Sequence, residues 1–103
     1  MSTAEKWRNL HDATLESLEF CWASGEARIR VRTGDGTSSR YIVMASPVRF
    51  ISCGRQMPWG RSVSINAVRG PTSTGDACVL EIEMQSGDLI RIEAGAFRLL
   101  EDE

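Results

Sequence analysis

His11 and Asp12 are the residues whose types come closest to a catalytic pair. His11 is the single histidine of the chain, and a carboxylate directly follows it. An imidazole oriented by a carboxylate can act as a general base toward a Ser or Cys nucleophile. Adjacent residues do not naturally present both groups to one reacting atom, however, and the sequence holds no Gly-x-Ser-x-Gly motif. Asp12 is more simply a turn or cap residue, so the sequence does not predict an enzyme.

The cysteines and glycines offer little material for a cofactor site. Cys21, Cys53 and Cys78 lie 32 and 25 residues apart and form no Cys-x-x-Cys pair. One histidine does not complete a usual set of zinc ligands, and an odd number of cysteines does not indicate a disulfide framework. Gly34 and Gly36 precede a predicted strand, whereas a phosphate-binding loop opens a helix. The sequence therefore predicts neither a metal nor another cofactor.

Arginines are concentrated in the middle of the chain. Residues 28–69 include eight arginines and one acid, Asp35, for a formal charge of +7, while the other residues sum to −9. Alternating positions of a strand share one sheet face. A cationic face with an aromatic residue suits an anionic ligand such as single-stranded nucleic acid. The candidate site comprises Arg28, Arg30, Arg32 and Tyr41, with Arg40 and Arg55 as extensions. The alternative is that these arginines pair across strands with Glu19, Glu81, Glu83 and Glu93, as on an ordinary solvated sheet face.

The second candidate site is an irregular segment around Trp59. Pro58 and Gly60 flank this large aromatic residue, and Arg55 and Gln56 lie just before it. Trp and Arg are enriched among the residues that dominate binding energy at protein interfaces. This composition favours a protein partner. The alternative is that Trp59 folds back as a lid on a small core.

The elements that position these residues are mostly strands. The first ten residues predict a short helix, because Ser2 and Glu5 have capping-box spacing and Trp7 and Leu10 share a face. From residue 14 the apolar residues alternate with polar ones, which is typical of a half-buried sheet. A two-residue turn at residues 24–25 predicts a hairpin that pairs Trp22 with Ala27. In the same register Phe20 pairs with Ile29, Leu18 with Val31, and Glu19 with Arg30.

The middle of the chain predicts further strands separated by loops. Residues 40–45 are apolar on both faces, which indicates a central strand. Pro47 interrupts this strand pattern, and residues 48–53 resume it as an edge or bent strand. Residues 62–68 alternate again, which favours a strand, with a short helix from Ser62 as the alternative. Residues 70–76, which combine Gly, Pro, Ser, Thr and Asp, predict a loop.

The end of the chain predicts a second hairpin, from residues 78–84 and 88–94. A three-residue loop with Gly87 in the left-handed conformation pairs Ile82 with Ile90 and Leu80 with Ile92. This register also sets Glu81 against Arg91. A longer loop would set Glu81 against Glu93, a destabilising pair of like charges. Phe97, Leu99 and Leu100 are expected to close the core.

The length of 103 residues, with 42% hydrophobic and 25% charged side chains, fits one soluble domain over residues 1–103. We expect an α+β, mainly β fold: a curved antiparallel sheet or flattened barrel of about six or seven strands with a short N-terminal helix. No apolar run is long enough to span a membrane and no signal peptide is evident, so we expect a cytoplasmic protein. A homo-oligomer formed through an exposed strand edge is a further possibility.

Two short segments carry a resemblance to known proteins. They are Leu10-His11-Asp12-Ala13-Thr14-Leu15-Glu16-Ser17-Leu18 and Ser86-Gly87-Asp88-Leu89-Ile90-Arg91-Ile92. Together with the intervening hairpin, they are similar to small uncharacterised bacterial domains. Some of these are grouped with the immunity proteins that neutralise polymorphic toxins. The resemblance implies a β-rich protein without catalytic activity that acts by binding a protein partner.

Overall fold

Six strands form one antiparallel sheet in the computed structural model, which describes residues 7, 9–33 and 39–101. The strands are β1 (Thr14–Cys21), β2 (Glu26–Arg32), β3 (Arg40–Cys53), β4 (Ile65–Thr74), β5 (Ala77–Met84) and β6 (Leu89–Glu101). Their order in the sheet is β1-β2-β3-β6-β5-β4. The prediction of a mainly β fold with six antiparallel strands is confirmed, and the sheet is not closed into a barrel.

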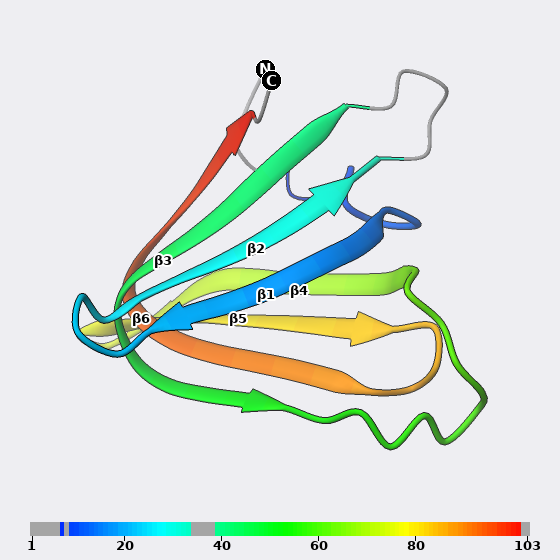
Figure 1. Cartoon of the computed structure of the whole chain (residues 1–103). Coiled ribbons are helices and arrows are strands. Elements are labelled where there is room, and N and C mark those ends of the chain that lie inside the picture. Colours follow the sequence, from blue (N-terminus) through cyan, green and yellow to red (C-terminus); the bar gives the residue numbers. More distant parts are fainter. Residues whose placement is uncertain (1–6, 8, 34–38, 102–103) are drawn as a thin grey trace.

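The two longest strands, β3 and β6, bend and divide the sheet into an upper and a lower half (Figure 1). β3 pairs with β2 only as far as Ala45, whereas its pairing with β6 continues to Cys53. A β-bulge lies between Val48 and Phe50, and bulges bend the strand that contains them. Pro47, which has no N–H to donate, lies between the last pair of β3 with β2, at Ala45, and this bulge, where the ladder is already irregular. The edge or bent strand predicted after Pro47 is therefore confirmed.

The edge strands β1 and β4 meet at one end only. Thr14 and Ser64 form an isolated bridge. The N–H of Leu15 donates to the Val63 carbonyl at 2.8 Å, and the N–H of Ile65 donates to the Ala13 carbonyl at 2.9 Å. No further pair joins β1 to β4 in the described residues. The result is a V-shaped sheet pinned at one end and open along the rest of β1.

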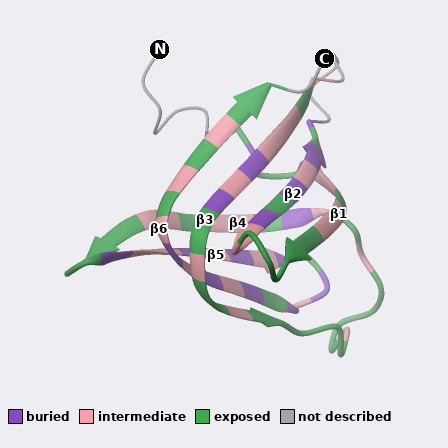
Figure 2. Cartoon of the chain, turned by 60° about the vertical axis from the view of Figure 1, so that its left-hand side comes forward, coloured by how far each residue is buried: buried purple, intermediate pink, exposed green. Residues whose placement is uncertain are grey.

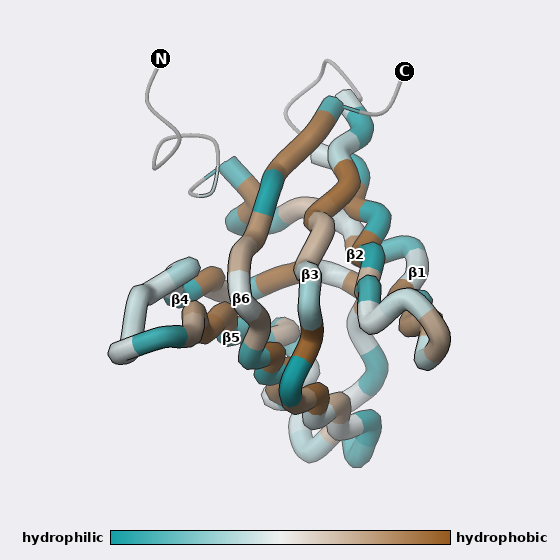
Figure 3. The backbone as a smooth tube through the Cα atoms, turned by 90° about the vertical axis from the view of Figure 1, so that its left-hand side faces the viewer, coloured by the Kyte–Doolittle hydropathy of each residue, from teal (hydrophilic) through white to brown (hydrophobic). Residues whose placement is uncertain are grey.

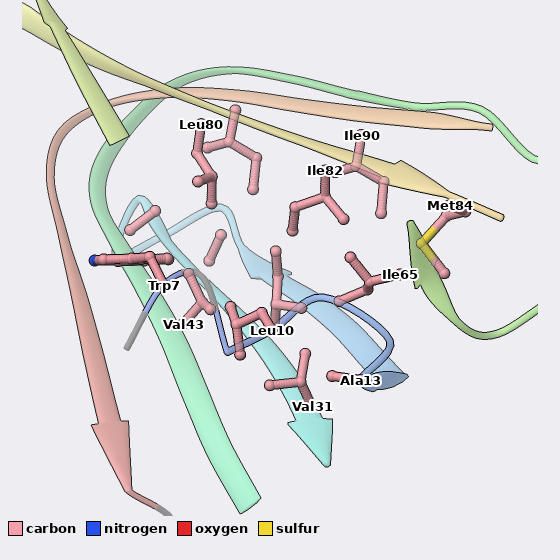
Figure 4. Close-up of a cluster of buried hydrophobic side chains, with 14 of the residues drawn as sticks. Trp7, Leu10, Ala13, Val31, Val43, Ile65, Leu80, Ile82, Met84 and Ile90 are labelled. Atoms are coloured by element: carbon pink, nitrogen blue, oxygen red, sulfur yellow. The ribbon is translucent and has the colours of Figure 1, made fainter. Parts of the chain in front are cut away.

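The core fills the space between the two halves. Figure 4 shows Leu80, Ile82 and Ile90 projecting from the lower half toward Val31 and Val43 of the upper half. Leu10 lies between them with no exposed surface. Along β2, β5 and β6 buried residues alternate with more exposed ones, which is the period-2 pattern of a sheet with one covered face (Figure 2).

The predicted N-terminal helix falls mainly on residues 1–6 and 8, which lie outside the described residues. No helical element is found in the described part of the chain. Trp7 and Leu10, which the helix was expected to bury on one face, are both buried, at 6% and 0% exposure. The segment around residues 7–13 therefore packs into the core.

The predicted register of the first hairpin is wrong by two residues. Phe20 pairs with Ala27, Leu18 with Ile29, and Glu19 with Arg28. The turn spans residues 22–25, with Gly25 at φ 71° and its N–H bonded to the Cys21 carbonyl at 2.9 Å. A shift of two residues keeps every side chain on its face, so hydrophobic alternation did not distinguish the two registers.

The second hairpin has the predicted register. Leu80 pairs with Ile92, Ile82 with Ile90, and Glu81 with Arg91. Gly87 has φ 93°, as the three-residue loop requires. Nη1 of Arg91 lies 3.2 Å from Oε2 of Glu81, the opposite-charge contact that the prediction used to choose the register.

The predicted loop over residues 70–76 is wrong, because β4 continues to Thr74. Gly70, at φ 98°, and Pro71 fall in a register shift between Arg69 and Thr72. β4 is an edge strand, which tolerates a bulge and a missing donor. The β4–β5 hairpin projects from the rest of the fold, with hydrophilic residues toward its tip (Figure 3).

The last strand is longer than predicted and ends at Glu101. Phe97 and Leu99 pack against the core cluster as expected. Leu100 is 39% exposed, so its expected part in closing the core is wrong. It lies opposite Ile42, on the convex face of the upper half.

Candidate interaction site

The predicted arginine site lies on the convex face of the upper half. Arg28, Arg30 and Arg32 alternate with the buried residues of β2, so their side chains are directed away from the core. Nη2 of Arg28 lies 2.8 Å from Glu26, and Nε of Arg30 lies 3.4 Å from Glu19. The predicted alternative of cross-strand pairing thus accounts for Arg30, whereas Arg28 pairs with Glu26 within β2.

Arg32 and Arg40 face each other across β2 and β3. No ion pair joins either of them to another residue that the structure describes. Arg98, opposite Met44 on β6, lies on the same face. We call Arg28, Arg30, Arg32, Arg40 and Arg98 the arginine face. Like charges opposite each other destabilise a sheet, so two arginines at this position are not explained by stability.

Tyr41 does not join the arginine face. It is partly buried and packs against the hydrophobic core cluster, on the concave side of the sheet. Its Cα partner on β2 is Val31, whose side chain is also buried. The predicted combination of a cationic face with a stacking aromatic is therefore wrong, because Tyr41 and the arginines occupy opposite faces of the same strands.

His11 and Asp12 form an exposed turn. Nδ1 of His11 lies 3.1 Å from Oδ2 of Asp12, and both side chains are more than half exposed. Asp12 has φ 66°, and its carboxylate accepts a hydrogen bond from the Gln85 amide at 3.0 Å. No hydrogen bond joins His11 to a Ser or Cys side chain among the described residues. The turn interpretation of Asp12 is confirmed.

Trp59 is held in a fixed position although its side chain is 76% exposed. This exposure excludes the alternative that Trp59 forms a lid on the core. The backbone N–H of Trp59 donates to the Ser86 carbonyl at 3.0 Å. A Cβ placed on Gly87 would lie 2.6 Å from Cζ3 of Trp59 and 2.9 Å from Cγ of Pro58. The indole therefore rests directly on the Gly87 backbone, and only glycine leaves room for it there.

The carboxylate of Asp88 anchors the segment that carries Trp59. It accepts hydrogen bonds from the N–H of Gln56 at 2.6 Å, from the N–H of Met57 at 2.8 Å and from the Ser86 hydroxyl at 2.7 Å. Met57 has φ 52°, a conformation that non-glycine residues keep only where their surroundings impose it. The Ser86 hydroxyl, the two amides and the charge of Arg55 hold the pKa of the Asp88 carboxyl below its usual range.

A shallow cleft of about 420 Å³ on the convex face of the lower half is lined by Gly87, the residue on which Trp59 rests. Phe50 and Leu89 line it from β3 and β6, and Pro58 and Gly87 line it from the two loops. Phe50 is 47% exposed and Leu89 is 40% exposed. We call Phe50, Pro58, Trp59 and Leu89 the Trp59 patch. Arg91, Glu93 and the predicted residue Gln56 also line this cleft, so an apolar centre has a polar and charged surround.

Sequence reasoning found Trp59 but missed Phe50, Leu89 and Asp88. Phe50 faces outward because it follows the bulge that begins after Val48, and alternation counted through that bulge gives no reliable face. The one feature of the sequence that could have identified Asp88 is its position directly after Gly87, at the end of the hairpin loop. A short acidic side chain there can reach back to amides of a neighbouring loop.

The described residues contain no group of three or more His, Cys, Asp or Glu side chains placed to hold a metal ion. They also contain no helix long and apolar enough to cross a membrane. Cys21, Cys53 and Cys78 are all free thiols. A hydrogen bond with the Ser24 side chain lowers the pKa of the Cys21 thiol.

In comparisons with known proteins, no family model, no curated protein and no solved structure matches this chain.

Proposed function

We propose that this chain is a non-enzymatic protein-interaction domain that binds its partner through the Trp59 patch. The observation that carries the proposal is an exposed Trp59 on a segment fixed by Asp88 and Gly87. An anchor that is already ordered before binding loses little conformational entropy when it docks. An exposed side chain without a binding role does not need to be held in one position in this way.

The composition around Trp59 favours a protein over other partners. Aromatic residues and arginine are enriched at protein interfaces, and a polar rim that excludes water commonly surrounds the apolar centre. Phe50, Pro58 and Leu89 supply the apolar centre, and Arg91 and Glu93 belong to the rim. Both signs of charge in the rim suit a protein surface better than a polyanion.

The resemblance to immunity proteins suggests the class of partner. A toxin would bind an immunity protein as one folded protein binds another, without chemistry on either side. A toxin gene beside the gene for this chain would support this part of the proposal. If no toxin gene lies beside the gene for this chain, only the binding experiments test the Trp59 patch.

The test compares Trp59→Ala with the matched variant Trp22→Ala. Trp22 is also an exposed tryptophan in a turn, at 88%, but it lies outside the Trp59 patch. Proteins captured from cells of the source organism by the wild-type chain should be lost with Trp59→Ala and kept with Trp22→Ala. A hot-spot tryptophan contributes about 2 kcal/mol or more to binding, roughly a 30-fold change in affinity. Equal capture by all three chains would exclude the patch as the binding site.

Thermal unfolding separates binding from folding in the same variants. Trp59 is outside the core, so Trp59→Ala should unfold close to the wild-type temperature. Light scattering on the same samples tests self-association through a strand edge: an oligomer that persists in Trp59→Ala would assign the interface to an edge instead.

The arginine face supports a second candidate function, the binding of an anionic ligand or single-stranded nucleic acid. The observation in its favour is that Arg32, Arg40 and Arg98 have no ion pair with any described residue. Because Tyr41 lies on the opposite face from the arginines, no aromatic side chain from the predicted set is available to stack on a base. This candidate therefore ranks second. Retention on an oligonucleotide matrix that falls steeply with salt would support it, and absence of retention at low salt would exclude it.

A further inference from the structure

A second cavity, separate from the Trp59 patch, opens on the concave side of the sheet. It has a volume of about 800 Å³ and lies between β1, the end of β3 and residues 54–63. Its walls are mostly apolar, and they include buried core residues at the floor. The apolar side chains that line it are Leu15, Leu18, Met57, Val63, Met84 and Ile90.

The open edge of the sheet gives access to this cavity. Beyond Leu15, β1 has no partner on its outer side among the described residues, because the bridge to residue 64 is confined to the start of the strand. β3 keeps one hydrogen bond on the β2 side after Ala45, from the N–H of Val48 to the Gly25 carbonyl at 2.8 Å, and has no pair on that side beyond it among the described residues. The cavity therefore opens at the place where a closed barrel would have continued its hydrogen-bond ladder.

Two arginines stand at the mouth of the cavity. Arg55 and Arg61 both line it and are exposed, and no ion pair or hydrogen bond joins either guanidinium to another described residue. The acids that line it are Glu16 and Asp88. The carboxylate of Asp88 already accepts the hydrogen bonds from Gln56, Met57 and Ser86. Glu16 and Asp88 balance the charge of the two guanidiniums, but neither carboxylate bonds to them, so the N–H groups of Arg55 and Arg61 are available to a ligand.

We propose that this cavity binds a small amphipathic carboxylate, with an aliphatic tail on the apolar wall and the carboxylate at Arg55 and Arg61. A volume of about 800 Å³ lies within the range of small-molecule sites, which are mostly apolar with a few polar groups that orient the ligand. The planar guanidinium matches a carboxylate with two parallel hydrogen bonds. This inference does not depend on the proposed protein partner, because the Trp59 patch lies on the opposite face of the sheet.

Cys53 provides a direct readout, because its free thiol lines the cavity and is exposed. Decanoate is the probe. Its binding should slow the alkylation of Cys53 by iodoacetamide severalfold, as measured by peptide mass spectrometry. Cys21, an exposed thiol outside the cavity, is the internal control and should react at an unchanged rate. Decanol and decyltrimethylammonium, which share the tail but not the carboxylate, should protect Cys53 far less.

Matched arginine variants test the head-group contact. Arg55→Gln with Arg61→Gln should weaken the protection by decanoate about tenfold. Arg32→Gln with Arg40→Gln makes the same change in net charge on the arginine face and should leave protection unchanged. Arg61→Gln alone should also weaken it, and this variant keeps Arg55 beside Asp88 and so leaves the anchor of residues 56–57 intact. Circular dichroism checks that every variant is folded.

Three results would overturn the inference. Decanoate that leaves Cys53 as reactive as before excludes binding in the cavity. Equal protection by decanol or decyltrimethylammonium excludes a carboxylate-specific mouth. Equal weakening in the two double-arginine variants shows that general electrostatics, rather than Arg55 and Arg61, governs the effect.

Discussion

The carboxylate of Asp88 binds the backbone N–H groups of Gln56 and Met57, which lie 32 and 31 residues before it in the sequence. Replacing it by Ala removes both oxygens and leaves the N–H groups of Gln56 and Met57 and the Ser86 hydroxyl without this acceptor. We therefore expect Asp88→Ala to lower the melting temperature and to release residues 55–60. The indole N–H signal of Trp59 in an NMR spectrum should shift and broaden. A signal that stays at the wild-type position would contradict the anchoring role of Asp88.

The same carboxylate gives the segment a pH dependence. Its pKa is depressed in the folded chain, while an unfolded aspartate titrates near about 3.9. The stabilisation is therefore fully present above that pH and is lost as the pH falls through the lower pKa of the folded state. Acid titration of the Trp59 signal should show release only below about pH 3.9. Release between pH 5 and 7, well above the ordinary aspartate range of about 3.9, would show that another group controls the segment.

Gly87 is needed both for its backbone conformation and for the space it leaves. Gly60 has a comparable φ of 97° but nothing within 4 Å of an added Cβ. Gly60→Ala should thus cost only the backbone term, about 1–2 kcal/mol. Gly87→Ala should cost more, because the added methyl group displaces Trp59. Denaturant unfolding of both variants gives the comparison, and equal losses of stability would show that Trp59 does not rest on Gly87.

Among the strands, cross-strand charge pairs can fix a hairpin register that hydrophobic alternation alone leaves open. The second hairpin could be predicted because one register opposed Glu81 to Arg91 and the other opposed Glu81 to Glu93. The first hairpin offered no such choice. Moving Glu19 from Arg30 to Arg28 still opposes opposite charges, so the correct four-residue turn and the predicted two-residue turn were equally acceptable.

Local composition also misled where an edge strand tolerates irregularity. Gly70 and Pro71 are typical of loops, yet β4 runs through them because its outer side needs no ladder bonds. For the candidate site, sequence identified the exposed Trp59 from its Pro and Gly neighbours. It did not identify Phe50 or Leu89, because they join Trp59 only through the bend of β3 and the pairing of β3 with β6.

The pair of Arg32 and Arg40 gives a test at this scale. Arg40→Glu replaces a like-charge cross-strand pair with an opposite-charge pair, so it should stabilise the fold by about 0.2–1 kcal/mol. The gain should shrink at high salt. Arg98→Glu, opposite Met44, is the matched control and should not stabilise. If Arg40→Glu destabilises the chain in chemical denaturation, the two side chains do not face each other as described.

In the whole molecule, folding cancels much of the charge separation seen along the sequence. Four of the eight arginines between residues 28 and 69 have glutamate or aspartate partners: Arg28, Arg30, Arg49 and Arg69. The other four have no ion pair with a described residue. Arg32 and Arg40 lie on the convex arginine face, and Arg55 and Arg61 lie at the mouth of the concave cavity. The remaining positive charge is thus divided between two surfaces.

The V-shaped sheet also separates the candidate sites from each other. Met57 lines the concave cavity and Pro58 lines the convex cleft, while Gly54 and Asp88 line both. Variants at Trp59 and at Arg61, neither of which is shared, therefore probe the two sites separately.

Site-specific photocrosslinking tests the proposed interaction most directly. The photoreactive residue p-benzoylphenylalanine replaces Phe50, inside the Trp59 patch, or Trp22, outside it, in cells of the source organism. We predict a discrete crosslinked protein from position 50, none from position 22, and loss of the product when Trp59→Ala is added. A crosslink from position 50 that survives Trp59→Ala, or equal products from both positions, would contradict binding through the Trp59 patch.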